Sequence, residues 1–253
     1  MTTLRAAAAA AALVLLLGGC SKDTNNAEVV SIASSGPPAE AMDALVAAAT
    51  VLQTGNYTFV VASPAFTAEG FVHLPSESAK VTIDAHDEKF EIVLAEPDRW
   101  VRSSAGIVPG AGADTWFHVD SSEIQEGGDL DLELTDPDVV GLDALFAAVT
   151  DAQGDAKTVT GTIDGGKVQS PNGFLDNATI KAMGKAASAL PFTANLDSKG
   201  RLAELDIDAP AAGDALAGRW VFTVSGYDEQ KPQTKPAGRI EDLPASAYAK
   251  LNG

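Results

Sequence analysis

Apolar residues recur at the 3.6-residue spacing of an amphipathic helix in three parts of the chain. The first stripe ends at the turn Gly55-Asn56 and comprises Met42, Leu45, Val46, Ala49 and Leu52. The second comprises Leu142, Leu145, Phe146 and Val149, after Asp136-Pro137, a pair typical of an N-cap and a first helical position. The third comprises Ile180, Met183, Ala187 and Leu190. The pattern predicts three helices, each with one apolar face.

Between these stripes the apolar period changes to two, which indicates strands with one buried face. Such alternation is clear around Phe59, Val81 and Ile92, continues near Trp100 and Trp116, and returns after the second helix as a single strand. A hairpin then precedes one last strand at Trp220, Phe222 and Val224. About nine short strands with close turns predict an α+β fold, an antiparallel sheet curved over helices. No repeat and no linker follows Pro38, so residues 39–253 are expected to form a single domain.

The first 38 residues have a different character. Arg5 precedes an apolar run from Ala6 to Leu17, which is too short to span a bilayer, and the run ends in Leu17-Gly18-Gly19-Cys20. This string resembles the lipobox of bacterial lipoproteins, which implies cleavage after residue 19 and acylation of Cys20. Residues 20–38 are polar, small and proline-terminated, as in a flexible tether. The alternative is an ordinary secretory signal with an incidental cysteine.

Charge and cysteine content exclude several classes of protein. The formal net charge is −18, which disfavours a protein that tracks nucleic-acid phosphates. One cysteine can form neither an internal disulfide nor a zinc-thiolate cluster. We therefore expect no nucleic-acid partner, no metal and no cofactor.

Two motifs look like ligand sites but fit simpler interpretations. Gly161 to Lys167 has P-loop spacing, but Val168 stands where a magnesium-binding Ser or Thr belongs, and the context predicts strand, turn and strand. Carboxylates alternate in Asp129 to Leu134, but Leu134 occupies the place of the EF-hand glycine, so a strand with an acidic face is favoured and weak calcium contact stays open.

No catalytic constellation is recognisable. His73, His86 and His118 are far apart, none has the spacing of a metal-binding pair, and each is predicted to lie at the surface or rim. The chain has no Gly-x-Ser-x-Gly elbow. We expect a protein that is not an enzyme, although a triad formed only in the fold stays open.

The order of elements, the string DPDVVGLDALFAAV, and Thr160-Gly161-Thr162 resemble the actinobacterial lipoproteins of the LppX, LprA, LprF and LprG type, over about residues 39 to 245. Those lipoproteins are similar in fold to the periplasmic carrier LolA. The resemblance implies a half-barrel of antiparallel strands with helices on its concave side, enclosing a cavity for the acyl chains of lipids or glycolipids.

On this resemblance, the predicted cavity walls are apolar positions on strands and helices. The strand positions are Phe59, Val61, Val81, Ile83, Ile92, Leu94, Leu205, Ile207 and Phe222. The helix positions are Leu142, Leu145, Phe146, Val149, Ile180, Met183 and Leu190. The alternative is that these side chains simply fill a solid core.

The sequence thus predicts a lipoprotein held on the extracytoplasmic face of the cell membrane by acylated Cys20. It is expected to carry lipid or glycolipid within the envelope. The alternative is a non-catalytic envelope scaffold with a solid core and an unidentified protein partner.

Overall fold

The structure is a computed structural model that describes residues 39–85, 88–125, 134, 138, 140–168, 177–211 and 217–251. Gly36–Gly253 form one compact unit. The α-helices are α1 (Ala39–Thr54), α2 (Leu142–Ala147), α3 (Asn177–Met183) and α4 (Ala245–Leu251). Strands of the first half are β1 (Asn56–Ala62), β2 (Thr67–His73), β3 (Ser78–Ala85), β4 (Glu88–Ala95), β5 (Asp98–Ser103) and β6 (Trp116–Val119). Those of the second are β7 (Val149–Gly154), β8 (Thr158–Ile163), β9 (Leu190–Leu196), β10 (Leu202–Ala209), β11 (Gly218–Ser225) and β12 (Ile240–Asp242).

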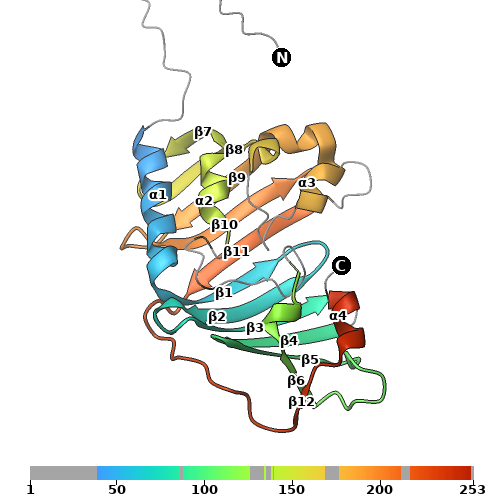
Figure 1. The fold of residues 1–253 in the computed structure, drawn as a ribbon. Coiled ribbons are helices and arrows are strands. Elements are labelled where there is room, and N and C mark those ends of the chain that lie inside the picture. The colour runs from blue at the N-terminus through green and yellow to red at the C-terminus, as the bar shows by residue number, and fades with distance from the viewer. Residues whose placement is uncertain are drawn as a thin grey trace, which may run out of the picture. The chain divides into compact units, whose positions relative to one another are not determined.

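The described strands form one open sheet in the order β12-β6-β5-β4-β3-β2-β1-β11-β10-β9-β8-β7 (Figure 1). All neighbouring strands pair in antiparallel orientation, except that β12 pairs with β6 in parallel. The pairing of β1 with β11 joins the early strands to the late ones. The α+β class and the mostly antiparallel sheet are therefore confirmed.

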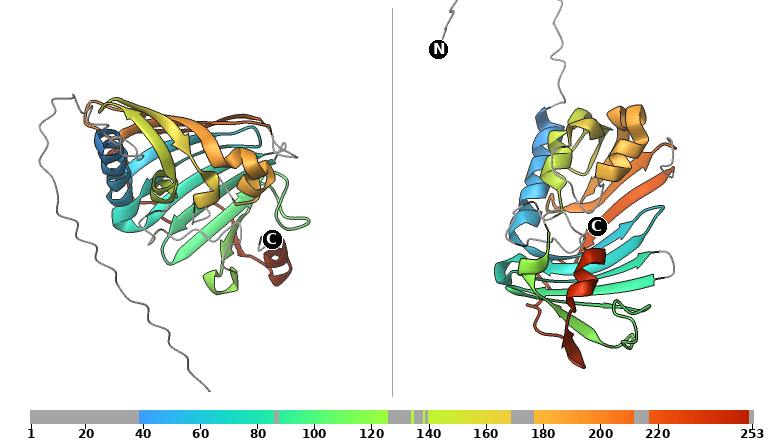
Figure 2. Two further views of the ribbon diagram at one scale, coloured as in Figure 1. Left: turned by 90° about the horizontal axis from the view of Figure 1, so that it is seen from above. Right: turned by 45° about the vertical axis from the view of Figure 1, so that its right-hand side comes forward.

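The helices α1, α2 and α3 lie over one face of this sheet, which bends around them (Figure 2). We call this face the inner face. Leu45, Leu52, Leu145 and Met183 from these helices are buried in the same hydrophobic cluster as the strand residues of that face. Helix α1 lies against α2 and against β7, β8 and β10. The helices therefore cover mainly the β7–β11 part of the sheet.

The second helix begins later than the sequence pattern predicts. Its N-cap is Gly141, with φ of 70°, and the first helical residue is Leu142. The Asp138 carboxylate accepts hydrogen bonds from the backbone N–H groups of Asp143 and Ala144 at 3.0 and 3.1 Å. Asp138 therefore satisfies the orphan donors of the helix start, and the predicted helix from Asp136-Pro137 is wrong at its described positions.

Two residues predicted to be helical are instead the first residues of strands. Val149 begins β7 and pairs with Ile163, because α2 ends at Ala147 and a β-branched side chain suits a strand. Leu190 begins β9, because the following Pro191 disfavours helical backbone at the residue before it. The third predicted helix is α3 followed by a 3-10 helix, Gly184–Ala189, after Gly184 takes φ of 55°.

Four elements were missed and one side chain was placed on the wrong face. Strand β2 lies between β1 and β3, β7 adds a second strand after α2, and β12 and α4 follow β11, which was predicted to be the last strand. Val46 is 55% exposed, so it does not belong to the apolar face of α1. The buried face is carried by small residues as well, including Ala41 and Ala48.

A smaller cluster lies apart from the main core. Val93, Trp100 and Trp116 are buried together, with Ala95 and Ile240 packed against them. They alternate along their strands with residues of the main cluster, so they lie on the opposite face of the sheet. Strand β12 therefore covers apolar side chains on the outer face through Ile240.

Candidate functional site: the inner face of the sheet

Cross-strand pairing arranges the inner face in rows that run across the strands. One row is Val224, Phe59, Gly70, Val81, Ile92, Val101 and Phe117, from β11 to β6. The next is Leu205, Phe222, Val61, Ala68, Ile83, Phe90 and Ser103, from β10 to β5. Because every second residue of a strand faces the same side, each row brings together apolar side chains from distant parts of the sequence.

The sixteen predicted wall residues all lie in one place. Each belongs to the main hydrophobic cluster or packs against it. All are buried except Val81, Ile83 and Val149, which are half-buried. The pattern therefore identified side chains that gather on one face, whereas their binding of lipid stays a prediction.

The inner face is packed unevenly. Leu145, Leu190, Leu205 and Ile207, in the part covered by α1 and α2, are each 0% exposed. Among the described residues, no helix is paired with β2 to β6 as closely as α1 is with β7, β8 and β10. On β2 to β6 the inner-face residues Leu94, Val101 and Phe117 are buried, and Ala247 and Tyr248 of α4 belong to the same cluster, whereas Val81, Ile83 and Phe90 are half-buried.

The loop between β5 and β6 lies beside this half-buried part. Ile107, Val108 and Ala111 pack against the main cluster from that loop. Gly106 and Gly110 take φ of 83° and 86°, the left-handed region that favours glycine, and so allow the tight turns. The loop therefore adds apolar side chains to the main cluster.

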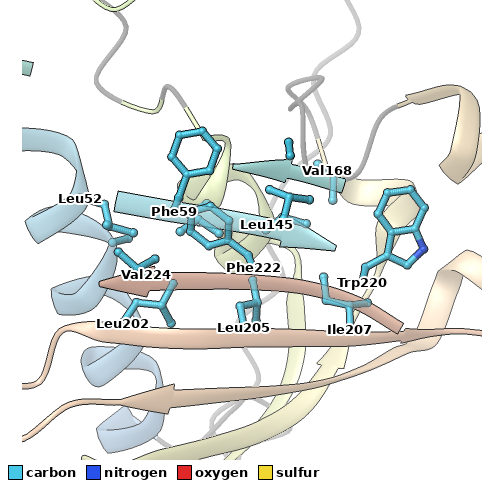
Figure 3. Close-up of a cluster of buried hydrophobic side chains, with 14 of the residues drawn as sticks. Leu52, Phe59, Leu145, Val168, Leu202, Leu205, Ile207, Trp220, Phe222 and Val224 are labelled. Carbon is cyan, nitrogen blue, oxygen red and sulfur yellow. The ribbon is translucent and has the colours of Figure 1, made fainter. Parts of the chain in front are cut away.

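Two aromatic rings lie between the half-buried and the covered parts. The Phe59 and Phe222 rings are stacked, with centroids 6.2 Å apart and planes at 28° (Figure 3). A Cβ built on Gly70 would lie 3.1 Å from Cζ of Phe59 and 2.2 Å from the Lys80 carbonyl oxygen. Because Gly70 has no side chain, the Phe59 ring can lie directly over the backbone at this position.

Gly161 has the same structural explanation in the covered part. A Cβ there would lie 1.9 Å from the Asp151 carbonyl oxygen and 2.9 Å from Cε1 of Phe192, its cross-strand partner. After β8 the Asp164 carboxylate accepts the Gly166 N–H, and Gly165–Lys167 form a 3-10 helix. No α-helix begins at Lys167, so the P-loop geometry is absent here. The strand predicted after this turn is wrong at its described positions, since Gly165–Lys167 are a 3-10 helix and Val168 is not in a strand.

Two tyrosines and a carboxylate interact electrostatically at one end of the sheet. Burial raises the pKa of the Tyr57 hydroxyl above its ordinary value, and Asp138 contributes in the same direction. Burial also raises the pKa of Asp138, although the N–H groups of α2 partly oppose this. The Tyr57 ring lies 6.1 Å from the Tyr227 ring, which carries the Arg201 guanidinium over its face at 4.2 Å. This network closes that end of the apolar face.

The two best-defined pockets among the described residues have a different character. One, of about 310 Å³, is lined by Lys89, Glu91, Arg102, Ser103, Ser104, Ala113 and Asp114. The other, of about 410 Å³, is lined by Asp98, Trp100, His118, Lys235, Ile240, Glu241 and Asp242. Neither contains any of the sixteen predicted wall residues.

Histidines and acids form no metal cluster within the described ranges. His73 Nδ1 lies 2.7 Å from Ser76 Oγ, and His118 Nε2 lies 2.9 Å from Asp98 Oδ1. Both rings are half-buried in strands. The same part of the chain contains no helix that is long and apolar enough to cross a membrane.

The predicted wall omits several residues of this face, although their strands were predicted. Tyr57, Phe192 and Trp220 are buried in the main cluster and are as large as the residues that were named. Their alternation with the named residues along β1, β9 and β11 was the available signal. Four features named from the sequence lie outside the described residues: Cys20, His86, the acidic segment before Leu134, and Asp136-Pro137. Leu134 itself is a buried turn residue.

No protein-family model and no curated protein sequence matches this chain.

Proposed function

We propose that this protein is a lipoprotein of the extracytoplasmic membrane surface that binds the acyl chains of lipids and carries them within the cell envelope. Binding takes place on the inner face of the sheet and involves no catalysis. The membrane anchor is the acylated thiol of Cys20.

The incompletely covered apolar face carries this proposal. Val81 and Ile83 are side by side in the rows of that face, yet both are half-buried and partly accessible to water. An acyl chain that covers them removes apolar surface from water, at about 25 cal/mol per Å². Their direct cross-strand partners on the same face, Ile92 and Phe90, are also apolar.

The leader supports the location. Arg5, the apolar run from Ala6 to Leu17 and the string Leu17-Gly18-Gly19-Cys20 have the order of a lipoprotein signal. Two or more acyl chains on Cys20 hold a protein at a bilayer, since each buried methylene contributes about 0.8 kcal/mol.

The half-barrel of LolA-like lipoproteins is part of the proposal. The open antiparallel sheet with α1, α2 and α3 on its apolar face supports it. In such an arrangement the covered strands give stability, and the uncovered strands give access for a ligand.

Binding can be tested on the compact unit of residues 36–253, purified from its host. We expect organic extracts to contain co-purified lipid by mass spectrometry, and we expect a fluorescent fatty acid to bind at about one per protein. Ile83→Asp should weaken binding strongly, because it places a charge among apolar groups. Val60→Asp is the matched control, since Val60 is 43% exposed on β1. Protein that is free of lipid and takes up none would contradict the proposal.

Anchoring can be tested in cells on the full chain. Cys20→Ser removes the acylated thiol and should release the protein from the membrane fraction, whereas Ser21→Ala should leave it there. Unchanged membrane attachment of the Cys20→Ser protein would rule out this anchor.

A second candidate is an envelope scaffold with a solid core. The near-complete burial of Leu205, Ile207 and Leu145 favours it, as does the polar lining of the two best-defined pockets. A scaffold with an acidic surface should bind a cationic partner in a way that weakens steeply with salt, and it should not take up fatty acid.

A further inference from the structure

The charge of this acidic chain is distributed unevenly. The whole sequence has a formal net charge of −18, yet the stretch from Gly165 to Leu196 contains three lysines and a single acidic residue, Asp176. The lysines are Lys167, Lys181 and Lys185. This stretch is therefore cationic within a strongly anionic protein.

The fold brings these lysines to one surface, formed by α3 and the two 3-10 helices Gly165–Lys167 and Gly184–Ala189. Each of these three elements lies against the other two. Ile180, Met183 and Ala187 are buried beneath them, whereas Lys167, Lys181 and Lys185 are exposed. We call these three residues the α3 lysine patch.

The described residues around the patch place little negative charge beside it. Lys167 forms an ion pair with Asp164, with 3.4 Å between Nζ and Oδ2. Lys181 and Lys185 form no ion pair with any residue that the structure describes. Their exposed neighbours are small and uncharged, namely Ala182, Gly184 and Ser188. The patch therefore offers two ammonium groups that an anionic partner can reach.

A second pair of lysines has the same spacing but different surroundings. Lys231 and Lys235 are exposed in the segment between β11 and β12. Lys235 lines a pocket together with Asp98, Glu241 and Asp242. Because these carboxylates oppose its charge, this pair is less suited to an anionic surface than the α3 lysine patch.

The patch also lies near the point from which the chain leads back to Cys20. Helix α3 and the start of α1 are at one end of the domain, whereas the segment between β11 and β12 is at the opposite end (Figures 1 and 2). The chain from Cys20 to Ala39 is at most about 65 Å long, at about 3.4 Å per residue. An anchor at Cys20 therefore holds this end of the domain within reach of the bilayer.

We propose that the α3 lysine patch binds the phosphate head groups of an anionic bilayer and so orients the anchored domain with α3 towards the membrane. This inference rests on the proposed function, from which it takes the anchor at Cys20. Each lysine near an anionic bilayer strengthens binding about fivefold. A few lysines are enough, because the anchor keeps the local concentration of lipid head groups high. The acidic remainder of the surface is repelled by the same lipids, which favours the same orientation.

The orientation can be measured on the chain from Cys20 onward, coupled through the Cys20 thiol to a maleimide lipid in vesicles. The coupling is unique, because Cys20 is the only cysteine. The lysines are then acetylated with an uncharged reagent, and mass spectrometry gives the rate for each. On vesicles with anionic phosphatidylglycerol, Lys181 and Lys185 should react about fivefold more slowly than on phosphatidylcholine vesicles. Lys231 and Lys235 should react equally on both, and about 0.5 M NaCl should abolish the difference.

Paired variants provide the matched control. In Lys181→Gln/Lys185→Gln, Lys167 reports the orientation and should lose its protection on anionic vesicles. In Lys231→Gln/Lys235→Gln, all three lysines of the patch should stay protected. The four substituted side chains are exposed, so neither variant should lower the thermal stability.

The outcomes separate this inference from the proposed function. Equal rates for the patch on both kinds of vesicle would overturn the inference, as would equal slowing of Lys231 and Lys235. Slowing that persists at high salt would also overturn it, because charge would not be the cause. None of these results bears on acyl-chain binding, which the fatty-acid measurement tests separately. Unchanged membrane attachment of the Cys20→Ser protein in cells would instead remove the anchor, and the inference would fail with it.

Discussion

The two parts of the sheet have similar apolar faces but differ in what lies over them. Among strands β7 to β11, α1 lies against β7, β8 and β10, and the 3-10 helix Gly184–Ala189 lies against β8. Leu190, Leu205 and Ile207 in this part are 0% exposed. Strands β2 to β4 carry Val81, Ile83 and Phe90 with part of their surface still in water. The same alternating sequence pattern therefore occurs both where side chains are fully packed and where some apolar surface remains in water.

This difference also explains why periodicity cannot distinguish a core from a binding surface. Leu205 and Ile83 occupy equivalent inward positions in one row of the sheet, four strands apart. They differ in exposure: Leu205 is 0% exposed on a strand that α1 lies against, whereas Ile83 is half-buried. A substitution should therefore have consequences that depend on which part it enters.

The largest contrast is expected for truncated aliphatic side chains. Leu205→Ala should lower the free energy of unfolding by about 3 kcal/mol, because a fully buried leucine leaves a cavity. Val81→Ala should cost only about 1 kcal/mol, because the side chain is half-buried. Urea titrations of both variants give the comparison, and equal costs would show that the two parts are packed alike.

The glycines beneath the aromatic rings provide the next contrast. Gly161→Ala should cost about 3 kcal/mol, because its Cβ would overlap the Asp151 carbonyl oxygen and the Phe192 ring. Gly70→Ala should cost less, about 2 kcal/mol, because its Cβ would lie farther from the Lys80 carbonyl oxygen, at 2.2 Å, and from the Phe59 ring, at 3.1 Å. Gly200→Ala is the control for backbone strain alone, since φ is 76° there and nothing lies near its Cβ. A larger loss for Gly70 than for Gly161 would reverse the assignment of the looser part.

A smaller effect is expected at the start of α2. Asp138→Ala removes the carboxylate that accepts two backbone N–H groups and should cost about 1 kcal/mol. Because α2 lies against α1 over the covered strands, the loss should appear as faster hydrogen exchange in α2. Asp84→Ala, an exposed change on β3, is the control and should alter neither quantity. Equal exchange rates in both variants would remove Asp138 from the account of this helix.

The smallest effect concerns pH and the outer face of the uncovered strands. The hydrogen bond from Arg102 lowers the pKa of Glu91, and the charges of Arg102 and Lys80 act in the same direction. A carboxyl group whose pKa is lower in the folded protein than in the unfolded chain stabilises the fold. This stabilisation is complete above the unfolded pKa, near 4.5, and it is lost as the pH falls through the lower, folded pKa. The free energy of unfolding falls between pH 5 and pH 3, and in Glu91→Gln this fall should be smaller by at most about 1 kcal/mol. An unchanged pH profile in urea titrations would show that the pair contributes nothing.

Much of the sheet could be predicted from the sequence because its strands alternate large apolar and polar residues. Strand β1, with Phe59 and Val61, and β4, with Ile92 and Leu94, are such cases. Strand β2 gives a weaker signal, since Ala68 and Gly70 are small and glycine is uncommon within strands. The reason for Gly70 is the Phe59 ring, a contact visible only after the two strands pair.

Helix ends were less predictable than helix faces. Leu142, Leu145 and Phe146 are buried as the stripe indicated, but Val149 fits the same spacing and belongs to β7. Periodicity alone does not show where a helix stops. The parallel strand β12 was missed for another reason, since three residues are too few to show a period.

The side chains of the candidate site could be predicted from the sequence. How unevenly the helices cover that site could not. Coverage depends on where α1 lies against β7, β8 and β10, a contact between the beginning of the domain and its later strands. No local pattern encodes that placement. The difference between Leu205 and Ile83 therefore appears only in the fold.

The central claim is that an acyl chain binds over β3 and β4 and not elsewhere. A fatty acid with a photoreactive diazirine in its tail, bound to the unit of residues 36–253 and irradiated, marks the residues that it contacts. The account predicts that mass spectrometry of the digested protein finds the label near Val81, Ile83 and Phe90, and that excess palmitic acid prevents the labelling. Label confined to the outer face around Trp100, or no label above the level with excess palmitic acid, would contradict it.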